Sequence, residues 1–241
     1  IVGGLITNSL ALLADAGHMF SDVAALGLSL FAIWIAERPP TPQRTYGYYR
    51  TEILAALVNG AALIAVSIYI FIEAYRRLQH PPEVLGAVMM WIAVGGLVVN
   101  LLGLWILRTG RDENLNVRGA WLHVLTDALG SVGAIIAGAL IWAFGWNWVD
   151  AAISAFIGLL VIYSAWRLVM ESVHVLMESA PRGIDVDEVR QIIAGTPGVI
   201  GVHDLHVWTI TSGLDSLSAH VVAEEEESHA DLLKRLRRTL Q

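Results

Sequence analysis

The chain has 241 residues, of which 56% are hydrophobic and 15% charged, and its formal net charge is -7. A soluble domain is typically about a quarter charged and under half apolar, so this composition indicates a membrane protein. The sequence contains no cysteine, which excludes disulfide bonds and thiolate metal sites and leaves His, Asp and Glu as candidate metal ligands.

Most of the negative charge lies near the C-terminus. Residues 1–170 contain ten acidic and nine basic residues, whereas residues 171–241 contain twelve acidic and six basic residues. From this change in composition we expect a membrane domain over residues 1–175 and a small, water-exposed domain over residues 176–241. An acidic surface does not suit a phosphate backbone, so nucleic acid is not an expected partner.

Several segments are long and apolar enough to span a bilayer, which requires about 20 mostly apolar residues. Five segments meet this requirement: residues 10–36, 53–72, 84–107, 117–144 and 148–169. Residues 1–6 are also apolar and are expected to be the end of a further helix. The sequence therefore predicts an all-α membrane domain of six helices, with the first helix truncated.

The basic residues of the short connections predict the orientation, because loops rich in Lys and Arg face the cytoplasm. The loops at 37–52 and 108–118 each carry three arginines, the loop at 73–83 carries two, and the loop at 143–149 carries none. The first two loops and the C-terminal domain should therefore be cytoplasmic. We expect a multi-pass protein of the cell (inner) membrane.

The C-terminal domain alternates between helical and extended patterns. Helices are expected over residues 185–194 and 228–240, and strands over residues 199–210 and 216–223. A helix, two strands and a helix form the larger part of a ferredoxin-like α+β fold. The last strand of that fold is expected to be missing from the sequence.

Two of the expected membrane helices carry the same His-x-x-x-Asp pattern, at His18/Asp22 and at His123/Asp127. Residues four apart share one face of a helix, and ionisable groups within a membrane usually have a function. Two such faces turned together offer two imidazole nitrogens and two carboxylates, the four-coordinate N/O ligand set that Zn²⁺ prefers. The two carboxylates would also balance the charge of the ion.

Polar side chains can instead join membrane helices by hydrogen bonds, and a single copy of the motif would favour that role. Two copies in separate helices favour a metal site. Protons compete with metal for such ligands, so a proton gradient can drive metal release, as in a metal/proton antiporter rather than an enzyme. A membrane metal-dependent hydrolase and a non-transporting metal sensor remain alternatives, although the sequence contains no His-Glu-x-x-His motif.

Several segments resemble signatures of the cation diffusion facilitator family, in the family's order along the chain. These segments are residues 9–22, 44–56, 123–131, 202–208 and 218–220. The likeness is closest to the bacterial zinc, cobalt and cadmium resistance branch. It implies a homodimeric exporter of Zn²⁺ driven by inward proton flow, with Cd²⁺ and Co²⁺ as further possible ions. It also implies a transport site at His18, Asp22, His123 and Asp127.

Family members with Asp at the position of His18 are similar but more tolerant of Cd²⁺. Relatives often carry His before Arg50, where this chain has Tyr49, so a second metal site in the 37–52 loop has no support. Asp15, three residues before His18, either accepts a hydrogen bond from a ligand histidine or lies at the interfacial end of its helix.

The expected strands of the C-terminal domain carry three histidines. In an alternating strand His203 and His206 point to opposite faces, so one of them can pair with His220 across the strands. The resemblance favours His203 and His220 as ligands of a cytoplasmic metal site. Ordinary, partly buried histidines are the alternative, because two nitrogens fall short of four ligands. Asp204 is a weaker candidate ligand and is expected instead to be solvated or to cap a turn.

Overall fold

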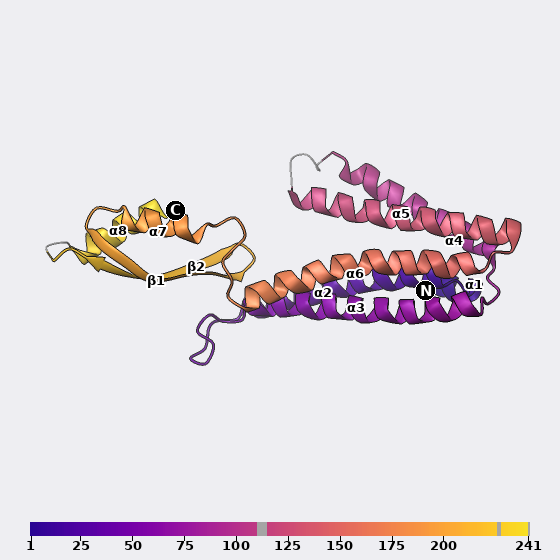
Figure 1. The fold of residues 1–241 in the computed structure, drawn as a ribbon, viewed down its shortest axis with the longest axis horizontal. Helices are drawn as coiled ribbons and strands as arrows, with labels where there is room; N and C mark the ends of the chain where they lie inside the picture. The colour runs from indigo at the N-terminus through magenta and orange to yellow at the C-terminus, as the bar shows by residue number, and fades with distance from the viewer. Residues whose placement is uncertain (110–114, 226–227, 241) are drawn as a thin grey trace. The chain divides into compact units, whose positions relative to one another are not determined.

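The computed structural model describes residues 1–109, 115–225 and 228–240. Within these residues the elements follow one another in the order shown in Figure 1: α1 (Val2–Thr7), α2 (Leu10–Ala36), α3 (Arg50–Gln79), α4 (Gly86–Leu107), α5 (Leu115–Phe144), α6 (Trp148–Leu176), α7 (Val186–Ala194), β1 (Val199–Thr211), β2 (Leu214–Ala223) and α8 (His229–Thr239).

The helices α2 to α6 are each long and apolar enough to cross a membrane. This confirms the five predicted spans, although α3 and α6 extend beyond the apolar segments of residues 53–72 and 148–169. The additional turns of α3 are rich in charged side chains, which apolarity alone does not detect, whereas those of α6 carry one carboxylate, that of Glu171. α1 is a short helix where the end of a further helix was expected, but with six residues it cannot span a membrane, so six spanning helices are not seen in the described part of the chain. The loop at 108–118, used to predict orientation, lies partly outside the described residues.

The chain forms two compact units, which are described separately. The first comprises Ile1–Gly27 and Val58–Leu168, and the second comprises Leu28–Leu57 and Val169–Gln241. Each unit therefore contains parts of the long helices α2, α3 and α6.

Close helix packing in the first unit depends on small residues. α4 and α5 lie side by side (Figure 1), and a Cβ atom on either Gly86 or Gly138 would be 2.8 Å from the carbonyl oxygen of the other. Glycine at both positions allows the two backbones to touch, as is common where no hydrophobic effect drives helices together in lipid.

The beginning of α2 is fixed by a carboxylate from α6. Asp150, 1% exposed, accepts hydrogen bonds from the Ser9 hydroxyl at 2.6 Å and from the backbone N–H groups of Leu10 and Ala11 at 2.7 and 3.2 Å. The first N–H groups of a helix have no partner within the helix, so this carboxylate satisfies donors that would otherwise be buried and unpaired. The guanidinium of Arg77 lies 3.9 Å from the same carboxylate.

The second unit contains an antiparallel hairpin. β1 and β2 are joined at Ser212 and Gly213, where Gly213 has a φ of 74°, a backbone conformation that glycine adopts without steric cost. Its core includes Ile193 of α7 and, from β1, Leu205 and Val207. The predicted helix–strand–strand–helix order is therefore present, and the domain is a small two-stranded α+β structure.

The turn of the hairpin contacts the first turn of α3. The hydroxyls of Thr211 and Ser212 both donate hydrogen bonds to the carboxylate of Glu52, the second at 2.8 Å. These contacts lie within the second unit and join residues about 160 positions apart in the chain.

Candidate functional site

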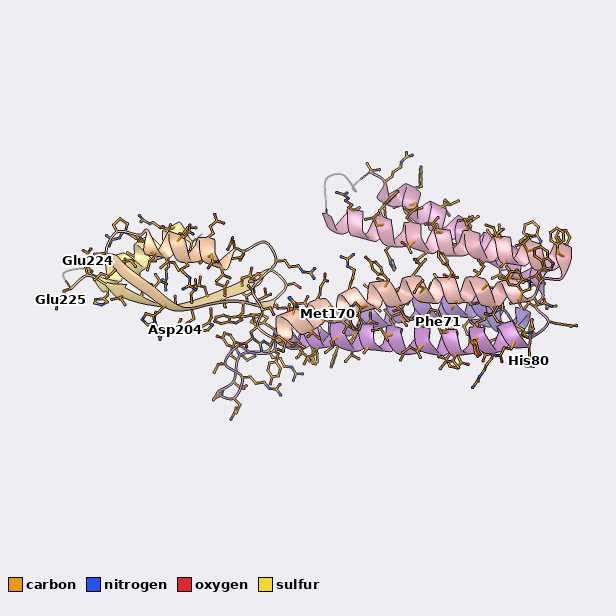
Figure 2. The ribbon with its side chains drawn as sticks, in the orientation of Figure 1. Phe71, His80, Met170, Asp204, Glu224 and Glu225 are labelled. Atoms are coloured by element: carbon orange, nitrogen blue, oxygen red, sulfur yellow. The ribbon has the colours of Figure 1, made fainter. Side chains whose placement is uncertain are left out.

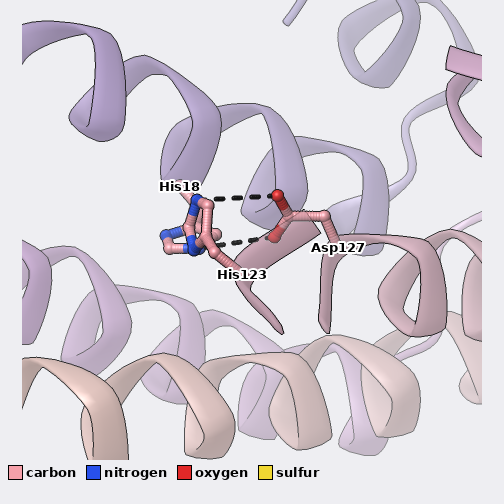
Figure 3. Close-up of side chains that lie close together, drawn as sticks. All are labelled: His18, His123 and Asp127. Atoms are coloured by element: carbon pink, nitrogen blue, oxygen red, sulfur yellow. Dashed lines mark ion pairs between the residues drawn. The ribbon is translucent and has the colours of Figure 1, made fainter. Parts of the chain in front are cut away.

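α2 and α5 bring all four residues of the repeated motif together in the first unit. The His123 Nε2 atom lies 3.3 Å from an oxygen of Asp22 and 3.7 Å from an oxygen of Asp127. The His18 Nε2 atom lies 3.7 Å from an oxygen of each of the same two aspartates. Figure 3 shows the two imidazoles facing the carboxylate of Asp127.

These separations suit a tetrahedral zinc site. With zinc–ligand distances of about 2.0 Å, neighbouring ligand atoms of a tetrahedron are about 3.3 Å apart. The four His–Asp separations of 3.3 to 3.7 Å are near this value. For His18, His123 and Asp127, one donor atom from each lies within 4.8 Å of the other two. Asp22 lies near both imidazoles but outside this group of three, so a four-ligand site requires its carboxylate to move closer to the others.

The charges of the cluster also fit a divalent cation. Two carboxylates carry a charge of -2 when ionised, and neutral imidazoles add none, so a bound divalent ion would make the cluster neutral. The side chains of His18 and Asp127 are 16% and 11% exposed, whereas that of His123 is 46% exposed. The cluster is thus enclosed on the side of His18 and Asp127 and open on the side of His123.

The structure tests the expected hydrogen bond from a ligand histidine to Asp15. Asp15 lies beside α5, where a Cβ on Gly130 would be 3.8 Å from its Oδ1 atom. The buried Nδ1 atom of His18 has no hydrogen-bond partner among the described residues, so Asp15 does not accept a hydrogen bond from it in this conformation. The expected bond from a ligand histidine to Asp15 is therefore not formed by His18.

A second cluster of possible ligands lies on the hairpin. His203 and His220 are directly opposite each other in the β1–β2 register, with ring centroids 5.2 Å apart. The Nδ1 atom of each histidine lies 3.2 Å from the Oδ2 atom of Asp204. His206 is opposite Ser218 instead, so the structure places His203, and not His206, with His220.

Asp204 is exposed, as expected for a solvated residue, but its position between the two histidines was not predicted. In a regular strand, neighbouring residues point to opposite faces, which would separate Asp204 from His203. The ladder instead has an irregularity between His203 and His206, and Asp204 has a φ of 51°, unusual for a residue with a side chain. This bulge turns the carboxylate toward the histidines, and Figure 2 shows Asp204 projecting from β1.

The histidines also change the acidity of that carboxyl group. The hydrogen bond from His203 holds the pKa of Asp204 below its usual value, and His220 acts in the same direction. Asp204 is therefore ionised at neutral pH and available as an oxygen ligand beside two imidazole nitrogens.

Comparison with known proteins relates almost the whole chain to one family. A family model described as the cation efflux transmembrane domain matches residues 1–177, and one described as the cation efflux protein cytoplasmic domain matches residues 181–241.

Three relatives represent the curated proteins that resemble this chain. The "Cadmium, cobalt and zinc/H(+)-K(+) antiporter" of Bacillus subtilis is 50% identical, over 93% of this chain and 73% of the relative. The "Metal cation efflux system protein CzcD" of Cupriavidus metallidurans is 51% identical, over 92% and 70% of the two chains. The "Zinc transporter ZitB" of Escherichia coli is 46% identical, over 100% and 77%.

Proposed function

This chain belongs to the cation efflux family, and from that premise we propose that it exports Zn²⁺ in exchange for protons, with Cd²⁺ and Co²⁺ as further substrates. Members of the family are multi-pass membrane transporters with a cytoplasmic domain, and the chain is therefore a transporter and not an enzyme. The names of its relatives include zinc, cadmium, cobalt and protons, which supports the proposed substrates.

The observation that carries the proposal is the meeting of two imidazoles and two carboxylates between α2 and α5. We assign His18, Asp22, His123 and Asp127 as the ligands of the transported ion. Bound metal requires deprotonated ligands, so protonation of the imidazoles and carboxylates weakens its binding. Protons that enter from the outer side would displace the ion there, and deprotonation toward the cytoplasm would restore the site.

The same ligand set argues against the two alternatives. A hydrolase needs an open coordination position for water or substrate, whereas four side chains would fill a tetrahedral zinc site. A sensor without transport needs no release mechanism, but a site of titratable ligands within a membrane provides one. Zinc flux driven by a proton gradient separates transport from sensing directly.

The finer architecture is also part of the proposal. We propose six spanning helices in the transport domain, a ferredoxin-like fold for the C-terminal domain, and a boundary between residues 175 and 176. We further propose a homodimer, which is supported by the match of residues 181–241 to the family's cytoplasmic domain.

For the C-terminal domain we propose a second metal site at His203 and His220, with Asp204 as a third ligand. The 3.2 Å separations from the two imidazoles to one carboxylate oxygen support this assignment. Three side chains leave one position of a tetrahedral site for water or for another ligand.

Transport is tested by reconstituting the full-length protein in lipid vesicles that contain a fluorescent zinc reporter. An outwardly directed proton gradient should drive zinc into vesicles through inverted molecules, and collapse of the gradient with an ionophore should stop it. Zinc flux that does not respond to the proton gradient would refute antiport, and the absence of any flux would refute transport.

The site assignment is tested with Asp127→Ala and a matched control, Asp231→Ala. Asp127 lies in the proposed site, whereas Asp231 is exposed on α8. Asp127→Ala should abolish gradient-driven flux because it removes one of four ligands and half of the balancing charge. Retained flux in Asp127→Ala, with normal flux in Asp231→Ala, would refute the assignment.

A further inference from the structure

The connection between α2 and α3 forms a pocket at the beginning of α3. Its volume is about 450 Å³, which is within the range of small-molecule sites. Its lining combines two guanidinium groups, a carboxylate, aromatic rings and an apolar side chain. These groups belong to the lining residues Arg44, Tyr46, Tyr48, Arg50, Leu54 and Glu178.

Backbone hydrogen bonds order this loop around Arg44. Thr41 and Arg44 pair through reciprocal N–H to carbonyl bonds of 3.2 and 2.9 Å, and the N–H of Gly47 donates to the Arg44 carbonyl at 2.9 Å. Gly47 has a φ of 67°, which an L side chain rarely adopts, so glycine permits the turn. The pocket is thus shaped by the loop's own backbone and does not need a ligand to form.

Arg44 presents an unneutralised guanidinium to the pocket. Its Cζ atom lies 4.6 Å from the centroid of the Tyr48 ring, so stacking on the ring orients the group. Among the described residues, no carboxylate oxygen lies within ion-pairing distance of Arg44. Arg50, in contrast, pairs with Glu178 at 2.6 Å. The three charged side chains therefore give the pocket a net charge of +1.

An apolar side chain lies beside these charges. Leu54 is 48% exposed and lies one turn into α3, a helix that can span the membrane. Tyr46 is 53% exposed and carries an amphipathic ring, of the kind found where membrane and water meet. A ligand that fills the pocket would therefore meet cationic groups in the loop and hydrocarbon at the helix.

We propose that this pocket binds the phosphate of an anionic phospholipid, with the guanidinium of Arg44 as the principal contact. A stacked guanidinium offers paired N–H donors that match two phosphate oxygens, and anionic lipid attracts basic groups next to a membrane helix. Leu54 favours a lipid over free phosphate because it would contact the beginning of the acyl chains. The proposal does not depend on which ion the protein transports.

The competing explanation is that the arginines of this loop only set membrane orientation, without a specific site. Arg38 provides a matched control, because it is in the same loop and stacks on Trp34 at 4.7 Å but does not line the pocket. The variants Arg44→Gln and Arg38→Gln remove the same charge from the same loop. Only Arg44 lines the pocket, so a phosphate bound there would make the effects of the two variants on lipid binding differ.

The test is native mass spectrometry of the full-length protein, purified in detergent with phosphatidylglycerol and phosphatidylcholine. The unmodified protein should retain phosphatidylglycerol in preference to phosphatidylcholine. Arg44→Gln should weaken that retention about tenfold, as expected for the loss of a charge-assisted hydrogen bond, and Arg38→Gln should not. Arg44→Lys should give an intermediate result, since it keeps the charge and loses the paired donors.

Two results would overturn the proposal. Equal loss of phosphatidylglycerol in Arg44→Gln and Arg38→Gln would show that general surface charge attracts the lipid. Displacement of the lipid by an excess of inorganic phosphate alone would show that the pocket takes a soluble anion. Retention of the lipid in excess phosphate, with selective loss in Arg44→Gln, supports a phospholipid site.

Discussion

The carboxylate of Asp150 accepts a hydrogen bond of 2.6 Å from the hydroxyl of Ser9, a residue 141 positions away in the chain. The same carboxylate accepts the backbone N–H groups of Leu10 and Ala11. One buried side chain at the beginning of α6 therefore holds the first turn of α2. Because His18 and Asp22 lie on α2, this contact also helps to position the proposed transport site.

Asp150→Ala should lower the free energy of unfolding by about 3 kcal/mol, because it leaves several buried donors without a partner. The change is measured by thermal unfolding of the protein in detergent. Asp185→Ala is the control: Asp185 also caps a helix, at the beginning of α7, but its hydrogen bonds are exposed and their loss should cost about 1 kcal/mol. Equal losses in the two variants would contradict a special role for the buried cap.

His18→Asp should shift transport from Zn²⁺ toward Cd²⁺. Asp is shorter than His, so the substitution widens the space between the four donor groups and suits the larger ion. The measurement is the ratio of Cd²⁺ to Zn²⁺ flux in vesicles that receive both ions. His80→Asp makes the same change in an exposed position after α3 and should leave the ratio unchanged. An unchanged ratio in His18→Asp would show that His18 does not determine the ion selectivity of the site.

The pKa of Asp204 should rise toward its usual value when His203 is replaced by Gln. The hydrogen bond from His203 lowers this pKa in the folded protein, so the carboxylate stabilises the fold above the unfolded pKa of about 4. That contribution is lost as the pH falls through the lower, folded pKa. An NMR titration of the Asp204 carboxyl group in the metal-free protein measures the change.

His206→Gln is the matched control for this titration. His206 is on the same strand but opposite Ser218, outside the His203–Asp204–His220 cluster. In His206→Gln the pKa of Asp204 should remain below its usual value, as in the unmodified protein. Equal upward shifts in both variants would show that general positive charge on the hairpin, and not the bond from His203, controls the carboxyl group.

The spans and the paired motifs were predictable because they depend on local patterns. An apolar run of about 20 residues and an i, i+4 spacing can both be found without knowledge of the fold. The position of Asp204 was not predictable in the same way. It depends on a bulge that interrupts the alternation of β1, and His203 and Asp204 are adjacent residues that a regular strand would separate.

The contacts of Asp150 and Glu52 were also beyond the reach of sequence patterns. Each joins residues more than 130 positions apart, and each was visible in the sequence only as an acidic residue near a helix end. Such residues are common at the first turn of helices, where they interact favourably with the helix dipole. Tertiary packing decides which of them acquires partners from another element.

Thr211→Val should loosen the contact between the hairpin turn and the first turn of α3. It removes a hydroxyl that donates to the Glu52 carboxylate, and a hydrogen bond to a charged group contributes about 1.5 kcal/mol or more, so local opening should become about tenfold more frequent. Amide hydrogen exchange of residues 211–214 and 50–54 measures this opening. Thr209→Val removes a hydroxyl that bonds Asp215 within the hairpin, and it should not accelerate exchange in residues 50–54. Both variants make the same chemical change in the same strand. Faster exchange of residues 50–54 in Thr211→Val alone would therefore show that Glu52 holds the hairpin on α3, and equal exchange in the two variants would contradict it.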